Sequence, residues 1–224
     1  MTASPSRLKL ERVTCIEGAD RLLNPLPEPY AAEIYGSWRL VNSIMHKSIA
    51  CLSREGPVAV ILVQEFGGLD PYLVGRHAKI LGGDLSRVLL SRAFKPETIP
   101  HAIDSIPEGV RKAVVVDPFL FAPDSPRDYW RLTPIVSAFK RALGRGISIA
   151  VFNRETVFGR GFLPEGGKFH HHTLHAIARV SRCGARSLKL ELVKHPHRPP
   201  AQTCIPSTEV GVHWDVQPRL LEWL

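Results

Sequence analysis

The sequence predicts an α/β protein in which helices cover both faces of a mostly parallel sheet and antiparallel strands extend one edge. Two observations indicate the parallel part: the runs 58–63 (VAVILV) and 112–116 (KAVVV) have the length of strands and are almost continuously apolar. Such runs are typical of parallel strands buried on both faces. The third observation is the run 187–193 (SLKLELV), whose alternation of polar and apolar residues predicts an antiparallel edge strand. Residues 203–212 could pair with it.

Strand and helix patterns alternate along the rest of the chain, as expected for one sheet between two helix layers. Residues 24–29 (NPLPEP) form a connector, because their three prolines exclude a regular helix. The remaining strand patterns cover residues 30–35, 87–91 and 146–152, and the helical patterns cover residues 43–52, 73–81 and 129–143.

The length of 224 residues and the hydrophobic content of 44% are those of one globular domain. We expect a flexible arm at residues 1–14, a core domain at residues 15–215 and a tail at residues 216–224. The sequence has no apolar run of roughly 18 residues and no apolar signal-peptide core near Met1. We therefore expect a cytoplasmic protein with no membrane partner.

The four cysteines, Cys15, Cys51, Cys183 and Cys204, include no C-x-x-C pair. Because the cytosol keeps thiols reduced, we expect buried thiols rather than disulfides. His171 and His175 have the i, i+4 spacing of zinc ligands on a helix, but no third ligand is evident. We therefore predict no metal site.

The net charge of +8 is concentrated in one part of the sequence. Residues 140–198 contain twelve Lys and Arg against three Asp and Glu, a net charge of +9, which leaves −1 for the rest of the chain. A basic segment of this kind favours a polyanionic partner. The alternative is a basic protein without such a partner.

Residues 36–43 (GSWRLVNS) have the frame of a phosphate-binding loop, G-x-x-x-x-G-K-[ST]. Gly36 and Ser43 keep that frame, whereas Val41 replaces the second glycine and Asn42 replaces the lysine. Valine disfavours the backbone conformations that a phosphate loop needs, and asparagine has no charge to bind a triphosphate. The stretch thus predicts the position of a nucleotide loop without most of its chemistry.

Five segments occur in the order of a known ATPase core. Residues 16–23 (IEGADRLL) resemble its N-terminal segment, 33–36 (EIYG) the strand before its phosphate loop, and 113–117 (AVVVD) its Walker B strand. Residues 162–167 (FLPEGG) resemble its second DNA loop, and 192–199 (LVKHPHRP) resemble a late basic segment. These segments are similar to the RecA/RadA recombinase family, above all to short archaeal paralogues of the RadB type. The resemblance implies a RecA-like core of the P-loop NTPase type.

The same resemblance implies a vestigial nucleotide site. Its residues are Gly36, Asn42, Ser43, Glu65, Asp117 and Asn153. Glu65 would lie near the attacking water, Asp117 would hold Mg²⁺, and Asn153 would sense the γ-phosphate. Alternatively, Glu65 is an exposed loop residue and Asp117 caps the turn before Pro118, the role that we favour for Asp117. Because Asn42 replaces the lysine, we predict neither ATP nor Mg²⁺ as a cofactor.

A DNA site is implied by the resemblance of residues 153–175 to the mobile loop that holds a single strand in RecA-like proteins. Lys and Arg on a glycine-rich backbone suit phosphate contacts, and Phe158, Phe162 or Phe169 could stack on bases. The predicted DNA-binding residues are Arg154, Arg160, Lys168, His170, Arg179, Lys194 and Arg198.

Together these features predict a non-catalytic RecA-fold recombinase paralogue. It would bind single-stranded or other DNA, or assist a RadA-type recombinase, in homologous recombination and DNA repair. One alternative is a weak, DNA-dependent ATPase, and another is a structural interaction subunit without DNA contact. Residues 119–122 (FLFA) match the Phe-x-x-Ala linker of RadA only by letters, so self-polymerisation is not expected.

Overall fold

The computed structural model describes residues 10–64, 68–156 and 163–211, and in this part of the chain eight strands form one sheet. The strands are β1 (Ala31–Gly36), β2 (Val58–Val63), β3 (Val88–Ala93), β4 (Lys112–Val116), β5 (Ser148–Arg154), β6 (Ala176–Cys183), β7 (Ser187–Lys194) and β8 (Gln202–Pro206). Their spatial order is β3-β2-β4-β5-β1-β6-β7-β8. The strands from β3 to β6 are parallel to their neighbours, and β7 and β8 continue the sheet in antiparallel pairs. The predicted fold class is confirmed.

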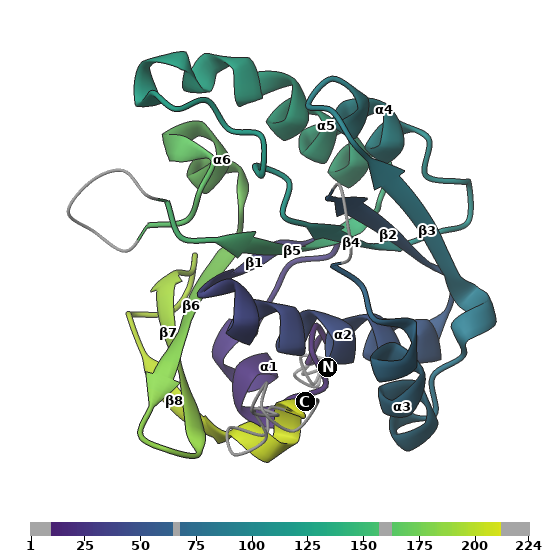
Figure 1. Cartoon of the computed structure of the whole chain (residues 1–224), viewed down its shortest axis with the longest axis vertical. Coiled ribbons are helices and arrows are strands. Elements are labelled where there is room, and N and C mark those ends of the chain that lie inside the picture. Colours follow the sequence, from purple (N-terminus) through teal and green to yellow (C-terminus); the bar gives the residue numbers. More distant parts are fainter. Residues whose placement is uncertain (1–9, 65–67, 157–162, 212–224) are drawn as a thin grey trace, which may run out of the picture.

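Helices lie on both faces of this sheet (Figure 1). The α-helices are α1 (Glu17–Leu23), α2 (Trp38–Glu55), α3 (Pro71–Leu81), α4 (Thr98–Asp104), α5 (Thr133–Gly144) and α6 (Gly167–Thr173). The 3₁₀ turns are η1 (Leu85–Arg87), η2 (Pro126–Leu132) and η3 (Ser207–Val210). In Figure 1, α1, α2 and α3 lie below the central strands, and α4, α5 and α6 lie above them. No helix among the described residues is both long and apolar enough to cross a membrane.

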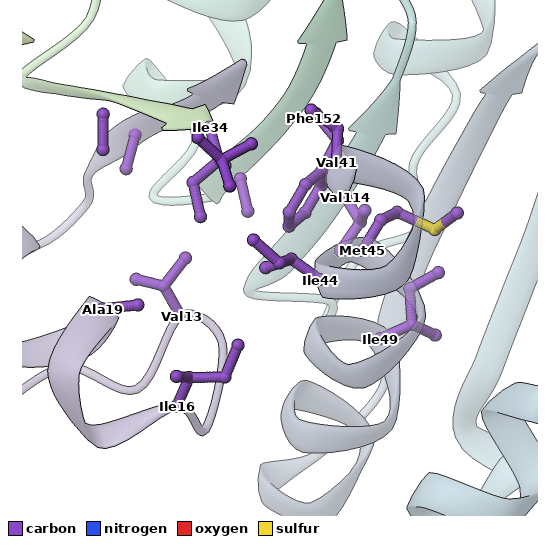
Figure 2. Close-up of a cluster of buried hydrophobic side chains, with 14 of the residues drawn as sticks. Val13, Ile16, Ala19, Ile34, Val41, Ile44, Met45, Ile49, Val114 and Phe152 are labelled. Atoms are coloured by element: carbon purple, nitrogen blue, oxygen red, sulfur yellow. The ribbon is translucent and has the colours of Figure 1, made fainter. Parts of the chain in front are cut away.

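The core has two layers, one on each face of the sheet. In the layer drawn in Figure 2, Ile44 and Met45 of α2 face Val114 and Phe152 of the sheet. In the other layer, residues of α4 and α5 pack on the opposite face of the same strands. Because the central strands are covered twice, every residue of β2 is buried, which explains its continuous apolar run.

The packed core extends to the N-terminal side of the predicted boundary at residue 15. Val13 is 1% exposed and belongs to the core, and the Asp20 carboxylate accepts hydrogen bonds from the Thr14 N–H and hydroxyl, both at 2.9 Å. The packed structure therefore begins before residue 15, and only part of residues 1–14 can be an arm. The predicted tail at 216–224 lies outside the described residues. The expected pairing of residues 203–212 with the strand at 187–193 is confirmed in part, because β8 pairs with β7 and forms the edge of the sheet.

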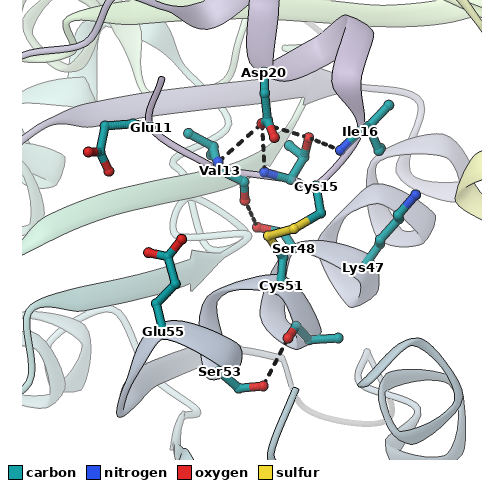
Figure 3. The surroundings of a disulfide bond; sticks show 12 residues. Glu11, Val13, Cys15, Ile16, Asp20, Lys47, Ser48, Cys51, Ser53 and Glu55 are labelled. Carbon is teal, nitrogen blue, oxygen red and sulfur yellow. Dashed lines mark hydrogen bonds between the residues drawn. A yellow bond between two sulfur atoms is a disulfide. The ribbon is translucent and has the colours of Figure 1, made fainter. Parts of the chain in front are cut away.

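The prediction of four thiols is also wrong, because Cys15 and Cys51 form a disulfide (Figure 3). The segment before α1 lies directly against α2, where the Ser48 hydroxyl donates to the Val13 carbonyl. Cys183 and Cys204 carry free thiols. The described residues contain no cluster of three metal-ligating side chains. His175 accepts a hydrogen bond from the Ala31 N–H at 2.9 Å.

Candidate functional site

The junction of β1 and α2 is where the sequence predicts a phosphate loop, and the structure has no loop there. Strand β1 ends at Gly36, and α2 begins at Trp38, with Ser37 between them. The N–H groups of Leu40 and Val41 already donate to the Ser37 carbonyl, at 2.9 and 3.1 Å. Residues 38–43 are therefore the first turns of a helix, whose backbone donors are used inside it. The predicted loop frame is wrong.

Gly36 has a role in the sheet. Its φ is +153°, and a Cβ at this position would lie 2.2 Å from the carbonyl oxygen of Val180 on β6. Glycine therefore allows β1 and β6 to approach each other. This requirement for glycine is independent of any phosphate.

The side chains that follow in α2 are held within the helix or left without a partner. The Ser43 hydroxyl donates to the Arg39 carbonyl at 3.1 Å. The Asn42 carbonyl lies 2.6 Å from His46 Nδ1, and Asn42 Oδ1 is buried without a hydrogen-bond partner in the described part of the chain. Neither side chain forms the contacts that a lysine and a hydroxyl make in a phosphate loop.

Asp117 and Arg154 form an ion pair at the carboxyl ends of β4 and β5. Asp117 directly follows β4, is 1% exposed and has a φ of +54°. Its N–H donates to the Phe152 carbonyl at 2.7 Å, and its carboxylate accepts from Arg154 Nε at 2.6 Å. The Arg154 guanidinium lies 4.9 Å from the centre of the Trp38 ring, a cation–π contact. Arg154, predicted to bind DNA, is thus the counter-ion of Asp117, with a side chain that is 42% exposed. The Asp117 carboxylate pairs with it rather than capping a turn.

Burial controls the protonation of Asp117. It raises the pKa of this carboxyl from 3.8 to about 6, and the nearby Arg154 charge offsets only part of that effect. Glu165 adds a smaller upward contribution to the same pKa.

A second polar network lies beneath the first, in the core. Asn153 Nδ2 donates to Glu33 Oε1 at 2.7 Å and to the Glu165 carbonyl at 2.8 Å, and His170 Nε2 lies 2.9 Å from the same Glu33 oxygen. Glu33, Asn153 and His170 are all 0% exposed. Within the described residues, Glu33 Oε2 and His170 Nδ1 have no hydrogen-bond partner.

This network corrects two predictions and adds one residue. His170 cannot contact DNA, because it is enclosed by Glu33 and the rings of Phe119 and Phe139. Asn153 binds Glu33 inside the core rather than pointing to a phosphate. The sequence analysis missed Glu33, although an acidic residue inside a buried strand pattern was a usable signal. Phe119 is itself 2% exposed. The 119–122 segment therefore cannot serve as a Phe-x-x-Ala linker, whose phenylalanine has to reach a neighbouring subunit.

Three further residues of the predicted DNA set are bound within the fold. Arg179 pairs with Glu155 at 2.7 Å and Glu191 at 3.6 Å. Lys194 donates to the carbonyls of His171 and Leu174, both at 2.7 Å, at the end of α6. Arg198 donates to the carbonyls of Arg21 and Leu22 at the end of α1. Basic side chains at helix C-termini satisfy carbonyls that the helix leaves open.

Lys168 alone of the described DNA set is an exposed residue on α6 without such a role. Phe169 beside it is 46% exposed, and Lys140 Nζ lies 4.4 Å from the centre of its ring. The predicted residues Arg160 and Glu65 lie outside the described residues, as do Phe158 and Phe162.

An apolar surface lies at the other end of the sheet, along β3. Among the described strands, β3 pairs only with β2, so its outer backbone edge is open. Leu89 and Leu90 on the strand are 40% and 47% exposed, and Phe94 just after it is 54% exposed. A shallow hollow of about 110 Å³ lies between β2, β3 and α4 and includes both leucines. Sequence reasoning missed this surface, because exposed and buried leucines look the same in a strand pattern.

The fold is that of the RecA-like class, with its parallel core and antiparallel extension. The crystal structure of the RadB recombinase is similar to this chain with a TM-score of 0.70, covering 87% of this chain and 95% of that chain. The two sequences are 18% identical, so the likeness is one of fold. No family model and no curated protein matches the sequence.

Proposed function

We propose that this protein is a RecA-fold accessory factor that works without nucleotide and assists a RadA-type recombinase in homologous recombination and DNA repair. The observation that carries the proposal is the ion pair between the buried Asp117 and the partly exposed Arg154. In phosphate-loop enzymes an aspartate at this kind of position holds the metal ion that bridges the phosphates. Here Arg154 of the same chain pairs with the aspartate, and its guanidinium lies 4.9 Å from the centre of the Trp38 ring.

The same residues argue against the ATPase alternative. Mg–ATP binding needs a run of backbone N–H groups and a lysine around the phosphates. The junction at Ser37 offers one residue between strand and helix, and Asn42 lies in the helix. These contacts do not fit a metal-bound triphosphate, so we assign no catalytic step.

The open edge of β3 supports the proposal that the protein binds a recombinase partner. An extended segment can add to such an edge through backbone hydrogen bonds, with its side chains in adjoining hollows. Leu89, Leu90 and Phe94 supply apolar contacts, and Arg92 and Lys95 are exposed beside them. This combination suits an apolar segment of the recombinase that also carries acidic residues.

Leu90→Lys tests this contact, measured by calorimetry with a purified RadA-type recombinase. A lysine in the middle of the edge should weaken binding at least tenfold while leaving the thermal midpoint unchanged, because Leu90 is exposed. Val193→Lys is the matched control: it changes a residue that is 39% exposed on β7, near the other end of the sheet. Equal binding by all three proteins would remove β3 from the interface, and absence of binding by the parent protein would refute the recombinase partner.

Single-stranded DNA is a second candidate ligand, favoured by the surface of α6. Lys168, Lys140 and Phe169 combine positive charge with an exposed ring, which suits a stacked base and its phosphates. A Lys140→Ala and Lys168→Ala double variant leaves the buried ion pairs intact. If both lysines contact phosphates, the slope of log affinity against log salt should become shallower by roughly 1.4. An unchanged slope would exclude this surface, and absence of DNA binding would leave the interaction-subunit role.

A further inference from the structure

Cys183 and Cys204 form a close pair on the antiparallel part of the sheet. Cys183 ends β6 and is half-buried, whereas Cys204 lies in β8 and is exposed. Their sulfur atoms are 2.9 Å apart, in hydrogen-bond contact. A disulfide bond spans about 2.0 Å, so the two sulfurs need to close by less than an ångström. Because β7 lies between the two strands and disulfides join Cα atoms about 4.4–6.8 Å apart, the bond also requires β6 and β8 to bend towards each other.

Strand register places both thiols on the same face of the sheet. Cys183 is opposite Ser187 of β7, and Cys204 is opposite Lys189 of β7. Ser187 and Lys189 are two residues apart, so their side chains share one face, the one opposite the buried Leu188. Both cysteines are reached from solvent on that face, and a bond between them crosses over β7.

We propose that Cys183 and Cys204 are a site of reversible oxidation that forms a second intramolecular disulfide. Together with the bond between Cys15 and Cys51, this reaction pairs all four cysteines of the chain. This proposal is argued from the geometry of the two cysteines alone and does not depend on the proposed role in recombination.

The oxidant is a disulfide compound, either a small one such as oxidised glutathione or a dithiol–disulfide protein. The thiolate of Cys204, the more exposed of the two, attacks one sulfur of the oxidant and releases its other sulfur as a thiol. The thiolate of Cys183 then attacks the Cys204 sulfur and releases the second thiol. Two electrons and two protons pass from the cysteines to the oxidant, which leaves as two thiols.

The acidity of Cys204 sets the pH at which the first step is fast. The hydrogen bond with Cys183 is the main cause that raises the pKa of the Cys204 thiol, and the Lys189 charge opposes it. Because the thiolate is the attacking species, oxidation should accelerate as pH rises from 7 towards 9.

The new bond would join β6 to β8 across the strand that separates them. Strand β8 is the outer strand of the sheet and also packs against α1. Closing residues 183–204 into a loop restricts the unfolded chain. The oxidised protein should therefore melt roughly 5–10 °C above the Cys183→Ser, Cys204→Ser variant.

Thiol mapping of the full-length parent protein tests the proposal directly. The protein is equilibrated with oxidised glutathione, denatured in N-ethylmaleimide and digested with trypsin. We expect one cross-linked pair of peptides, 183–186 with 195–219, and a separate pair, 13–21 with 48–54, from the other disulfide. After mild reduction with dithiothreitol the first pair should disappear and both cysteines should carry the alkylating group.

Two variants make the result unambiguous. Cys183→Ser should leave Cys204 alkylated or linked to glutathione, and Cys15→Ser with Cys51→Ser should still yield the peptide pair of 183–186 and 195–219. The proposal is overturned if both cysteines of the folded parent remain alkylatable after oxidation. It is equally overturned if they are recovered only as glutathione adducts or in covalent dimers.

Discussion

At the scale of single residues, two polar side chains that suggest nucleotide chemistry are bound by other groups of the same chain. Asp117 binds Arg154, and Asn153 binds Glu33 in the core. A buried carboxylate needs a partner of this kind, because an uncompensated charge in the interior is strongly unfavourable. Both contacts are formed within the chain, and neither requires a nucleotide.

Arg154→Ala should destabilise the fold by about 1–3 kcal/mol, because it leaves the Asp117 carboxylate buried without its counter-ion. Urea unfolding at pH 8 measures the loss. Asp117→Asn in the same background removes the buried charge, so the double variant should recover part of that stability. Strictly additive effects of the two substitutions would show that the side chains do not interact.

Asp117 also predicts how stability depends on pH. Its pKa is raised from 3.8 to about 6 in the folded state, so the folded protein holds this proton more tightly than the unfolded chain does. Its contribution to stability is complete below pH 3.8 and is lost as pH rises through 6, a change on the order of 2–3 kcal/mol. Unfolding free energies at several pH values from 4 to 7 measure this slope. Asp117→Asn should lack it, and an identical slope in both proteins would assign the effect to other groups.

At the scale of elements, the direct passage from β1 into α2 distinguishes this chain from a phosphate-loop protein. Gly36→Ala should cost at least about 2 kcal/mol of stability or prevent folding, since the new Cβ meets the Val180 carbonyl at 2.2 Å. Gly56→Ala at the other end of α2 is the control, because its Cβ would meet nothing within 4 Å. Chemical denaturation compares the two, and equal stability of both variants would contradict this role of Gly36.

The sequence predicted the positions of strands and helices better than it predicted the contacts of individual side chains. The bounds of β2 and β4 follow from their apolar runs, because burial on both faces leaves a local signature. The true start of α2 was missed, because the loop frame at Gly36 and Ser43 fits a helix turn equally well. The roles of His170, Lys194 and Arg198 depend on segments distant in the sequence, which no local pattern encodes. The exposed edge at Leu90 depends on strand order, which is a property of the whole sheet.

At the scale of the whole molecule, the sheet has the RecA-like strand arrangement. Exposed apolar and basic side chains lie on the edge strand β3 and on helix α6. At the carboxyl ends of β4 and β5, Asp117 pairs with Arg154, which also contacts the Trp38 ring. In the part of the chain that the structure describes, the apolar edge of β3 and the basic, aromatic surface of α6 are exposed.

Titration calorimetry with Mg–ATP tests the central proposal, that the protein works without nucleotide. We expect no saturable heat for the parent protein at millimolar ATP. Arg154→Ala should also bind none, because removing the counter-ion does not create a loop between Gly36 and Trp38. Stoichiometric binding of Mg–ATP by the parent protein, lost in a folded Asp117→Ala variant, would contradict the account.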